Sequence, residues 1–147
     1  MKRESINFLE GRWDIIQSEY YDKDNGWIVE RQYEQGEYWW EFLPAERIEI
    51  GQIVTFTGTH ITHIESEYRT KYSLDFDENN ETLIIDCSIY LEDGFLDICI
   101  EEWYRPEPRS NQESSYYLNL INEPDYPPPF FRHLIRRVAP PLPPQTE

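Results

Sequence analysis

The sequence has few residues that could form disulfides or bind structural metals, and it has no long apolar segment. Its 147 residues include 6 glycines, 1 methionine and 2 cysteines, and it has no Cys-x-x-Cys or His-Glu-x-x-His spacing. A disulfide framework or a zinc-ribbon fold is therefore excluded, and a chain of this length can bury a core without such help. No apolar stretch is long enough to cross a membrane or to act as a secretory leader, so we expect a cytoplasmic protein without membrane contact.

Positive charge is also scarce. The chain carries 13 Lys and Arg against 29 Asp and Glu, which gives a formal net charge of −16. Nucleic-acid binding requires clustered positive charge, so we expect no nucleic-acid partner. A strongly acidic surface favours solubility and is compatible with a basic protein partner. The exception is the C-terminal part, where Arg132, Arg136 and Arg137 lie close together.

Aromatic residues, in contrast, are abundant, with 5 Trp, 11 Tyr and 7 Phe. Such a composition favours β-structure. Alternating segments are separated by turn signals such as Asn25-Gly26 and Asp93-Gly94. We expect strands over residues 12–20, 27–33, 37–43, 46–50, 53–59, 68–76, 83–91, 95–104 and 115–121. This pattern predicts an all-β protein, a single up-and-down antiparallel barrel of eight to ten strands.

The two ends and one internal segment depart from alternation. Residues 2–10 predict a short N-terminal turn, and the prolines within 105–114 predict a loop. In residues 130–138 the apolar positions fall at helical spacing, which predicts one or two helical turns packed on the outside of the barrel. A last barrel strand is the alternative. We expect a barrel domain over residues 1–138 and a proline-rich flexible tail over 139–147.

Catalytic and metal-binding patterns are weak. His60 and His63 lie near Glu65 and Glu67, but residues three apart in a strand point to opposite faces. The acidic residues are too numerous for any spacing to single out a catalytic pair, and no Gly-x-Ser-x-Gly elbow is present. We therefore predict a non-catalytic protein with no metal site and no cofactor.

The stretch from Leu9 to Ile16 opens the first strand with Gly11-Arg12-Trp13. This Gly-x-Trp step, followed by a run of short strands through residue 121, resembles the lipocalin-like (calycin) barrel family. The resemblance implies a barrel whose closed end is plugged by Trp13. It also implies that a small hydrophobic molecule is bound in the mouth of the barrel.

The aromatic positions suggest which side chains would line such a site. An eight-stranded barrel either fills its interior with side chains or holds one small ligand between them. Tyr38, Trp40 and Phe42 share one face of a strand by their period of two. The candidate ligand-binding residues are Trp13, Tyr38, Trp40, Phe42, Tyr72 and Leu74. The alternative function is an acidic protein–protein interaction module with a filled core, using the acidic surface or the arginine segment as its contact.

The two cysteines are expected on opposite faces of one hairpin. A two-residue turn at Asp93-Gly94 makes the numbers of facing residues sum to 187. The resulting pairs are Leu91 with Leu96, Ile89 with Ile98, Cys87 with Ile100, and Ser88 with Cys99. A three-residue loop would instead set Ile85 against Glu101 and spoil the apolar face. We therefore predict two free thiols, with Cys87 buried and Cys99 outside, because opposite faces cannot reach disulfide spacing.

Overall fold

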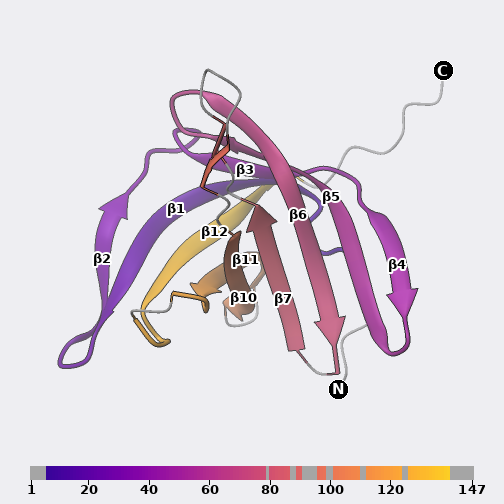
Figure 1. Ribbon diagram of the computed structural model, residues 1–147. Coiled ribbons are helices and arrows are strands. Elements are labelled where there is room, and N and C mark those ends of the chain that lie inside the picture. Colours follow the sequence, from indigo (N-terminus) through magenta and orange to yellow (C-terminus); the bar gives the residue numbers. More distant parts are fainter. Residues whose placement is uncertain are drawn as a thin grey trace.

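The computed structural model describes residues 6–78, 80–86, 89–90, 96–98, 101–109, 112–123 and 126–139. This described part is all-β and contains no helix (Figure 1). The strands are β1 (Gly11–Asp22), β2 (Gly26–Gln32), β3 (Trp39–Phe42), β4 (Glu46–Ile50), β5 (Ile53–His63), β6 (Glu67–Asp77), β7 (Asn80–Asp86), β8 (Ile89–Tyr90), β9 (Leu96–Ile98), β10 (Glu101–Arg109), β11 (Gln112–Leu120) and β12 (Phe131–Ala139).

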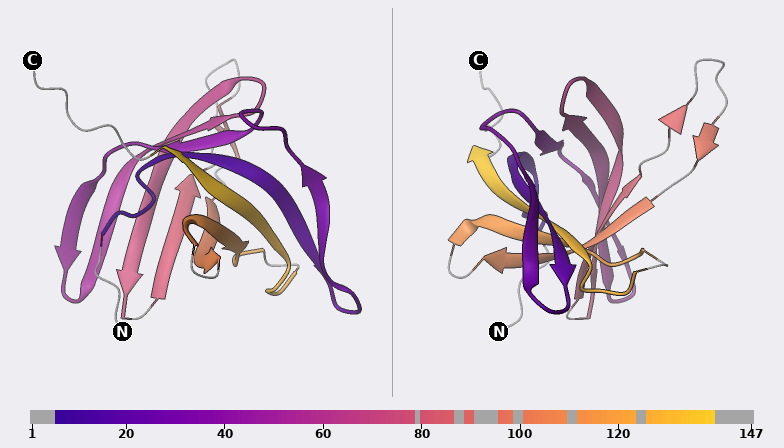
Figure 2. Two further views of the ribbon diagram at one scale, coloured as in Figure 1. Left: turned by 180° about the vertical axis from the view of Figure 1, so that it is seen from behind. Right: turned by 90° about the vertical axis from the view of Figure 1, so that its left-hand side faces the viewer.

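Eight of these strands close into an antiparallel barrel. Their order around the ring is β12-β11-β10-β7-β6-β5-β3-β1, and β12 pairs with β1 to complete it. Successive ring strands are neighbours in the chain, which is the up-and-down connection that the sequence predicts. β2 extends the sheet beside β1, β4 extends it beside β5, and β8 and β9 form a separate two-stranded ribbon (Figure 2).

The core fills the interior of this ring with alternate residues from every side. Aromatic rings and aliphatic side chains together form one continuous cluster. Its buried members are Leu9, Trp13, Ile15, Trp40, Phe42, Val54, Phe56, Tyr72, Leu74, Phe76, Leu83, Ile85, Tyr104, Tyr116, Leu118 and Ile135. The high aromatic content noted in the sequence is therefore used mainly to pack the inside of the barrel.

One end of the barrel is closed by the segment before β1. A turn at Phe8 and Leu9 lies within residues 2–10, where the sequence predicts a short N-terminal turn, and Leu9 is fully buried. Trp13 is also fully buried, and its indole N–H donates a hydrogen bond of 2.8 Å to the Leu9 carbonyl oxygen. The hydrogen bond from Trp13 therefore ties the first strand to the segment that precedes it, at the end of the barrel where the sequence places Trp13.

The expected helical turn over residues 130–138 is wrong. Residues Phe131–Ala139 form β12, which pairs with both β1 and β11 and closes the barrel. The helical spacing arose because Leu134 and Ile135, adjacent in sequence, are both buried although adjacent strand residues point to opposite faces. His133 and Arg137 share the inward side with Ile135, so polar residues occupy positions where alternation predicts apolar ones.

The expected loop over residues 105–114 is also wrong, because strand β10 continues to Arg109 and β11 begins at Gln112. Pro106 lies opposite Leu118 of β11, while β7 pairs only with residues 101–104 of β10. On one side, this part of β10 therefore has no partner among the described strands. Proline is tolerated there because a strand edge needs no backbone N–H donor on its open side.

The register predicted from the hairpin turn is confirmed between β7 and β10. Glu102 lies opposite Ile85, whereas the rejected three-residue loop would have set Glu101 there. All four residue pairs between these strands have numbers that sum to 187. The predicted placement of Cys87 and Cys99 themselves lies outside the described residues.

The short ribbon beyond this hairpin follows the same register only in part. Ile89 lies opposite Ile98, as predicted. Leu96, however, lies opposite Tyr90 and not opposite Leu91, because the register shifts between the two pairs of the ribbon.

Candidate functional site

A pocket of about 420 Å³ lies at the barrel end remote from Trp13. It is bounded by residues of β1, β2 and β12, by the segment between β2 and β3, and by Ile64, which follows β5. Its lining residues are Ser18, Glu30, Arg31, Tyr33, Tyr38, Ile64, Phe131 and His133. We call this the mouth pocket. Three of its walls are aromatic rings, and Tyr33 and Tyr38 meet edge to face with ring centroids 4.9 Å apart.

An irregularity in β1 brings Ser18 and His133 together in the mouth pocket. Ile15 pairs with Ile135 on the inner face, and the register of β1 against β12 then shifts before Gln17. This β-bulge turns Ser18 inward, opposite His133. The Ser18 hydroxyl and His133 Nδ1 are 2.8 Å apart and share a hydrogen bond. On one side of the bulge the inward residues of β1 and β12 are the apolar Ile15 and Ile135, and on the other side they are the polar Ser18 and His133.

His133 is uncharged at neutral pH. Burial lowers the pKa of its imidazole from 6.5 to about 4, because the charged form loses its hydration inside the barrel. The ring nevertheless lines the mouth pocket, where it meets Phe131 at 4.9 Å. It can therefore offer a neutral hydrogen-bonding group to a molecule that enters the pocket.

Behind His133 lies a second neutral imidazole. Trp40 packs edge to face against both histidines, with its ring centroid 5.3 Å from that of His133 and 5.1 Å from that of His60. Burial lowers the pKa of His60 to about 3. The row His133–Trp40–His60 thus places polar ring atoms inside the barrel without placing charge there.

Around Trp40 and His60, several buried polar side-chain atoms have no hydrogen-bond partner within the described part of the chain. Trp40 Nε1, His60 Nε2 and Thr70 Oγ1 are all buried without a hydrogen bond. His60 lies directly opposite Thr70 in the pairing of β5 with β6, so two of the atoms come from neighbouring positions. Such clustering is unusual, because an unmet buried donor or acceptor costs about 1–3 kcal/mol.

The candidate residues inferred from the sequence fall into two regions. Tyr38, Trp40, Phe42 and Tyr72 form a continuous chain of ring contacts, with successive centroids 6.3, 6.3 and 5.0 Å apart. Of this chain only Tyr38 lines the mouth pocket. Tyr72 instead faces the opposite end, where its hydroxyl donates to the Leu43 carbonyl at 2.7 Å.

Trp13 and Leu74 belong to the closed half of the barrel. Both are fully buried members of the core. Neither lines the mouth pocket. Their positions identify them as packing residues for the barrel, and the structure does not bring them to the same pocket as Tyr38.

The histidines of the interior were missed by sequence reasoning. The sequence predicts that His60 and His63 point to opposite faces of a strand. The structure confirms this, since His63 stacks on Trp39 while His60 packs against Trp40. The signal that could have identified His60 is its place in the period-two inward series of β5 that begins with Val54 and Phe56. Among the residues that the structure describes, no group of three or more His, Cys, Asp or Glu side chains could hold a metal ion.

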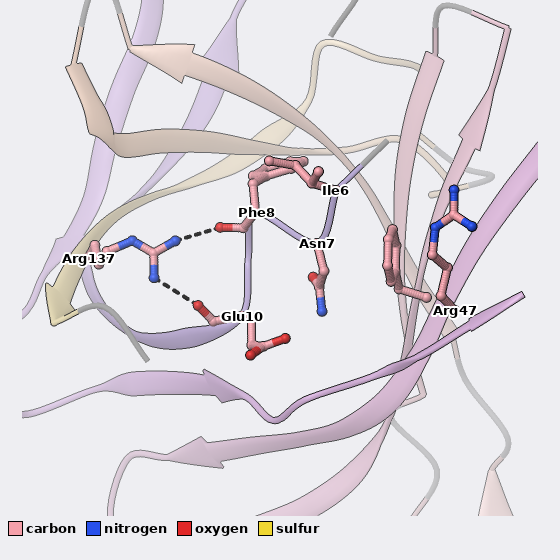
Figure 3. Close-up of a pocket in the computed structure, with 7 residues that line it drawn as sticks. Ile6, Asn7, Phe8, Glu10, Arg47 and Arg137 are labelled. Atoms are coloured by element: carbon pink, nitrogen blue, oxygen red, sulfur yellow. Dashed lines mark hydrogen bonds between the residues drawn. The ribbon is translucent and has the colours of Figure 1, made fainter. Parts of the chain in front are cut away.

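A second cavity, of about 470 Å³, lies at the closed end (Figure 3). Phe8, Glu10, Arg47 and Arg137 are among its lining residues. Figure 3 shows the Arg137 guanidinium directed at the backbone carbonyls of Phe8 and Glu10, to which it donates hydrogen bonds. It also lies 4.3 Å from the centre of the Trp13 ring. Arg137 therefore links the last strand to the segment before β1 and to Trp13, which together close this end of the barrel.

A groove of about 590 Å³ on the outer side involves Arg132. Its guanidinium lies 4.0 Å from the Trp27 ring centre and 3.7 Å from that of Tyr117, and it forms a partly buried ion pair of 2.9 Å with Glu19. Two arginines of the C-terminal segment, Arg132 and Arg137, are thus engaged within the molecule. Of the three arginines in this segment, only Arg136 is exposed.

The described residues include no helix long and apolar enough to cross a membrane. No known family model matches this chain, and no curated protein or solved structure matches it either.

Proposed function

We propose that this protein is a lipocalin-like, non-catalytic binding barrel that takes up a small, largely hydrophobic molecule in the mouth pocket. The observation that carries the proposal is the pocket's lining, in which Tyr33, Tyr38 and Phe131 surround the buried, neutral His133. Small-molecule sites are typically concave, mostly apolar and supplied with a few placed polar groups. The opening Gly11-Arg12-Trp13 step supports the same assignment by resemblance.

The size and charge of the pocket narrow the class of ligand. A volume of about 420 Å³ falls within the range of ordinary ligand sites. Glu30 and Arg31 bring opposite charges to the rim, whereas the floor is neutral because burial suppresses protonation of His133. The buried part of the ligand is therefore uncharged and aromatic or aliphatic, with one group that hydrogen-bonds to an imidazole.

Fluorescence titration tests this proposal directly. Trp40 lies 6.3 Å from Tyr38 and 5.3 Å from His133, so a molecule in the mouth pocket should change its emission. The panel should contain fatty acids, retinoids and haem. A native mass spectrum of the purified protein would in addition reveal a retained molecule. The absence of saturable binding across the panel would refute the proposal.

A matched pair of variants locates the site. Ile64→Trp places a large ring in the mouth pocket, whereas Ile6→Trp places the same ring at the closed-end cavity. We expect the first substitution to weaken binding about 10-fold or more, because it fills the space that the ligand needs. The second should leave the affinity unchanged. Equal effects of the two variants would contradict the assignment of the ligand to the mouth.

A further inference from the structure

Strand β4 forms an unusual margin of the barrel. It pairs with β5 over its whole length from Glu46 to Ile50, and no other described strand pairs with it. Figures 1 and 2 place β4 at the outer limit of the sheet with no ribbon beyond it. All five of its residues are exposed. A strand with one open edge presents unpaired backbone donors and acceptors that can accept another strand.

The outer face beside this edge is apolar. Ile48 and Ile50 share one face of β4, and Ile50 lies opposite Ile53 of β5. Their exposed fractions are 40%, 74% and 41%. Three exposed isoleucines on one corner of an otherwise strongly acidic protein form a patch that association would remove from water.

The charges of β4 are complementary to β4 itself. Arg47 and Glu49 lie two residues apart and therefore share a face, where they form an ion pair of 2.9 Å. In an antiparallel pairing of two copies about a two-fold axis at Ile48, Arg47 of each copy lies opposite Glu49 of the other. Moving the axis by one residue sets Arg47 against Arg47 or Glu49 against Glu49, and like charges directly opposite are destabilising. The charges thus select one register.

We propose that two copies of this chain associate through β4, with an antiparallel pairing centred on Ile48. The two isoleucines at the axis meet on the outer face, and two Arg47–Glu49 pairs form on the other. The barrel sheets of both copies then continue into one another. None of the residues of β4 lines the mouth pocket, so this association is independent of the proposed ligand binding.

Strand β2 forms a further open edge among the described strands, and it lacks this charge pattern. Strand β2 pairs only with β1 among the described strands, and its Val29 is 44% exposed. Its charged residues Glu30 and Arg31 are adjacent, so they point to opposite faces. Residues that pair across a two-fold axis share a face, so Glu30 and Arg31 cannot pair with each other in two copies. β2 is therefore a suitable control edge.

Sedimentation velocity of the full chain over a wide range of protein concentration tests the proposal. We expect a concentration-dependent dimer for the unmodified protein. Arg47→Glu sets like charges against each other in both cross-strand pairs and should weaken the dimer about 10-fold or more. The double variant Arg47→Glu with Glu49→Arg reverses both charges and should restore the dimer. Because these residues are exposed, circular dichroism should show an unchanged fold.

Two further variants decide whether β4 is the interface. Ile48→Lys sets two lysines against each other at the axis and should abolish the dimer, and Val29→Lys on β2 should leave it intact. A chain that stays monomeric at all concentrations overturns the proposal. So does a dimer that is sensitive to Val29→Lys but not to Ile48→Lys, or one that Arg47→Glu weakens and the charge-reversed double variant fails to restore.

Discussion

Replacing Trp13 with alanine tests whether the closed end depends on the plug formed by the first strand. Trp13 is fully buried, and it touches both the N-terminal segment and the last strand. Truncation of a buried aromatic side chain costs about 3–5 kcal/mol through lost transfer energy and the cavity that forms. The indole also supplies the hydrogen bond to Leu9 and a surface for the Arg137 guanidinium. We therefore expect a loss near the upper limit, about 5 kcal/mol.

The assay is urea denaturation followed by far-ultraviolet circular dichroism at neutral pH. A loss of this size is a third or more of the total stability of an ordinary domain, about 5–15 kcal/mol, so the midpoint should move clearly. Trp103→Ala is the matched control, because Trp103 is 38% exposed on the outer face. It should change the free energy of unfolding by less than about 1 kcal/mol. A Trp13→Ala variant as stable as the Trp103→Ala variant would refute the reasoning.

A double-mutant cycle then isolates the contact with Arg137. Trp13→Leu and Arg137→Met should together cost less than the sum of the single changes, by about 1 kcal/mol, because each single change already removes the ring–guanidinium contact. Strict additivity of the two changes would show that the 4.3 Å approach of Arg137 to the Trp13 ring contributes nothing to stability.

Three further predictions concern buried charge, pH and backbone packing. Glu19→Gln should cost about 1–3 kcal/mol by urea denaturation, because the partly buried Arg132 loses the charge of its hydrogen-bond acceptor; a loss below about 0.5 kcal/mol would contradict this. His60 and His133 have pKa values lowered to about 3 and 4, so the unfolded chain binds two more protons than the folded one once the pH falls below about 6.5. Stability should be unaffected by them above that pH and should fall towards pH 5 by up to about 3 kcal/mol per pH unit, and His60→Leu should halve that slope; a flat profile would disprove it. Gly58→Ala should destabilise by about 1–3 kcal/mol, because the added Cβ would lie within 3.2 Å of its neighbours, and a neutral outcome in thermal denaturation would show that they can yield.

The strand pattern of the middle of the chain was predictable because one face of each strand is buried there. Tyr72 and Leu74 alternate with Lys71 and Ser73, and the structure places the first two in the core. Turn chemistry adds the register, as in the hairpin that sets Glu102 opposite Ile85. In these segments local propensity, alternation and turn residues all favour the same structure.

The last strand could not be predicted in the same way, because its inward positions are polar. His133 is stabilised by Ser18, and Arg137 by backbone carbonyls before β1. Both partners lie more than a hundred residues away in sequence, so no local pattern signals them. The polar lining of the mouth pocket was not predicted for a related reason, since a β-bulge in β1 decides that Ser18 points inward.

The pairing of β12 with β1 has a consequence for how the protein is made. Arg12 lies opposite Ala139, so the first of the described barrel strands to be synthesised completes its ladder only with the last of them. Until the final strand leaves the ribosome, one edge of β1 stays open and the ring cannot close. Contacts of such large sequence separation slow folding, and a chain that stops before residue 131 would expose both β1 and β11 to pairing with other chains. Because β1 and β12 are neighbours, the start of the first barrel strand and the end of the last one lie side by side. A short linker from β12 to β1 would therefore allow the chain to begin at a different turn while the ring stays intact.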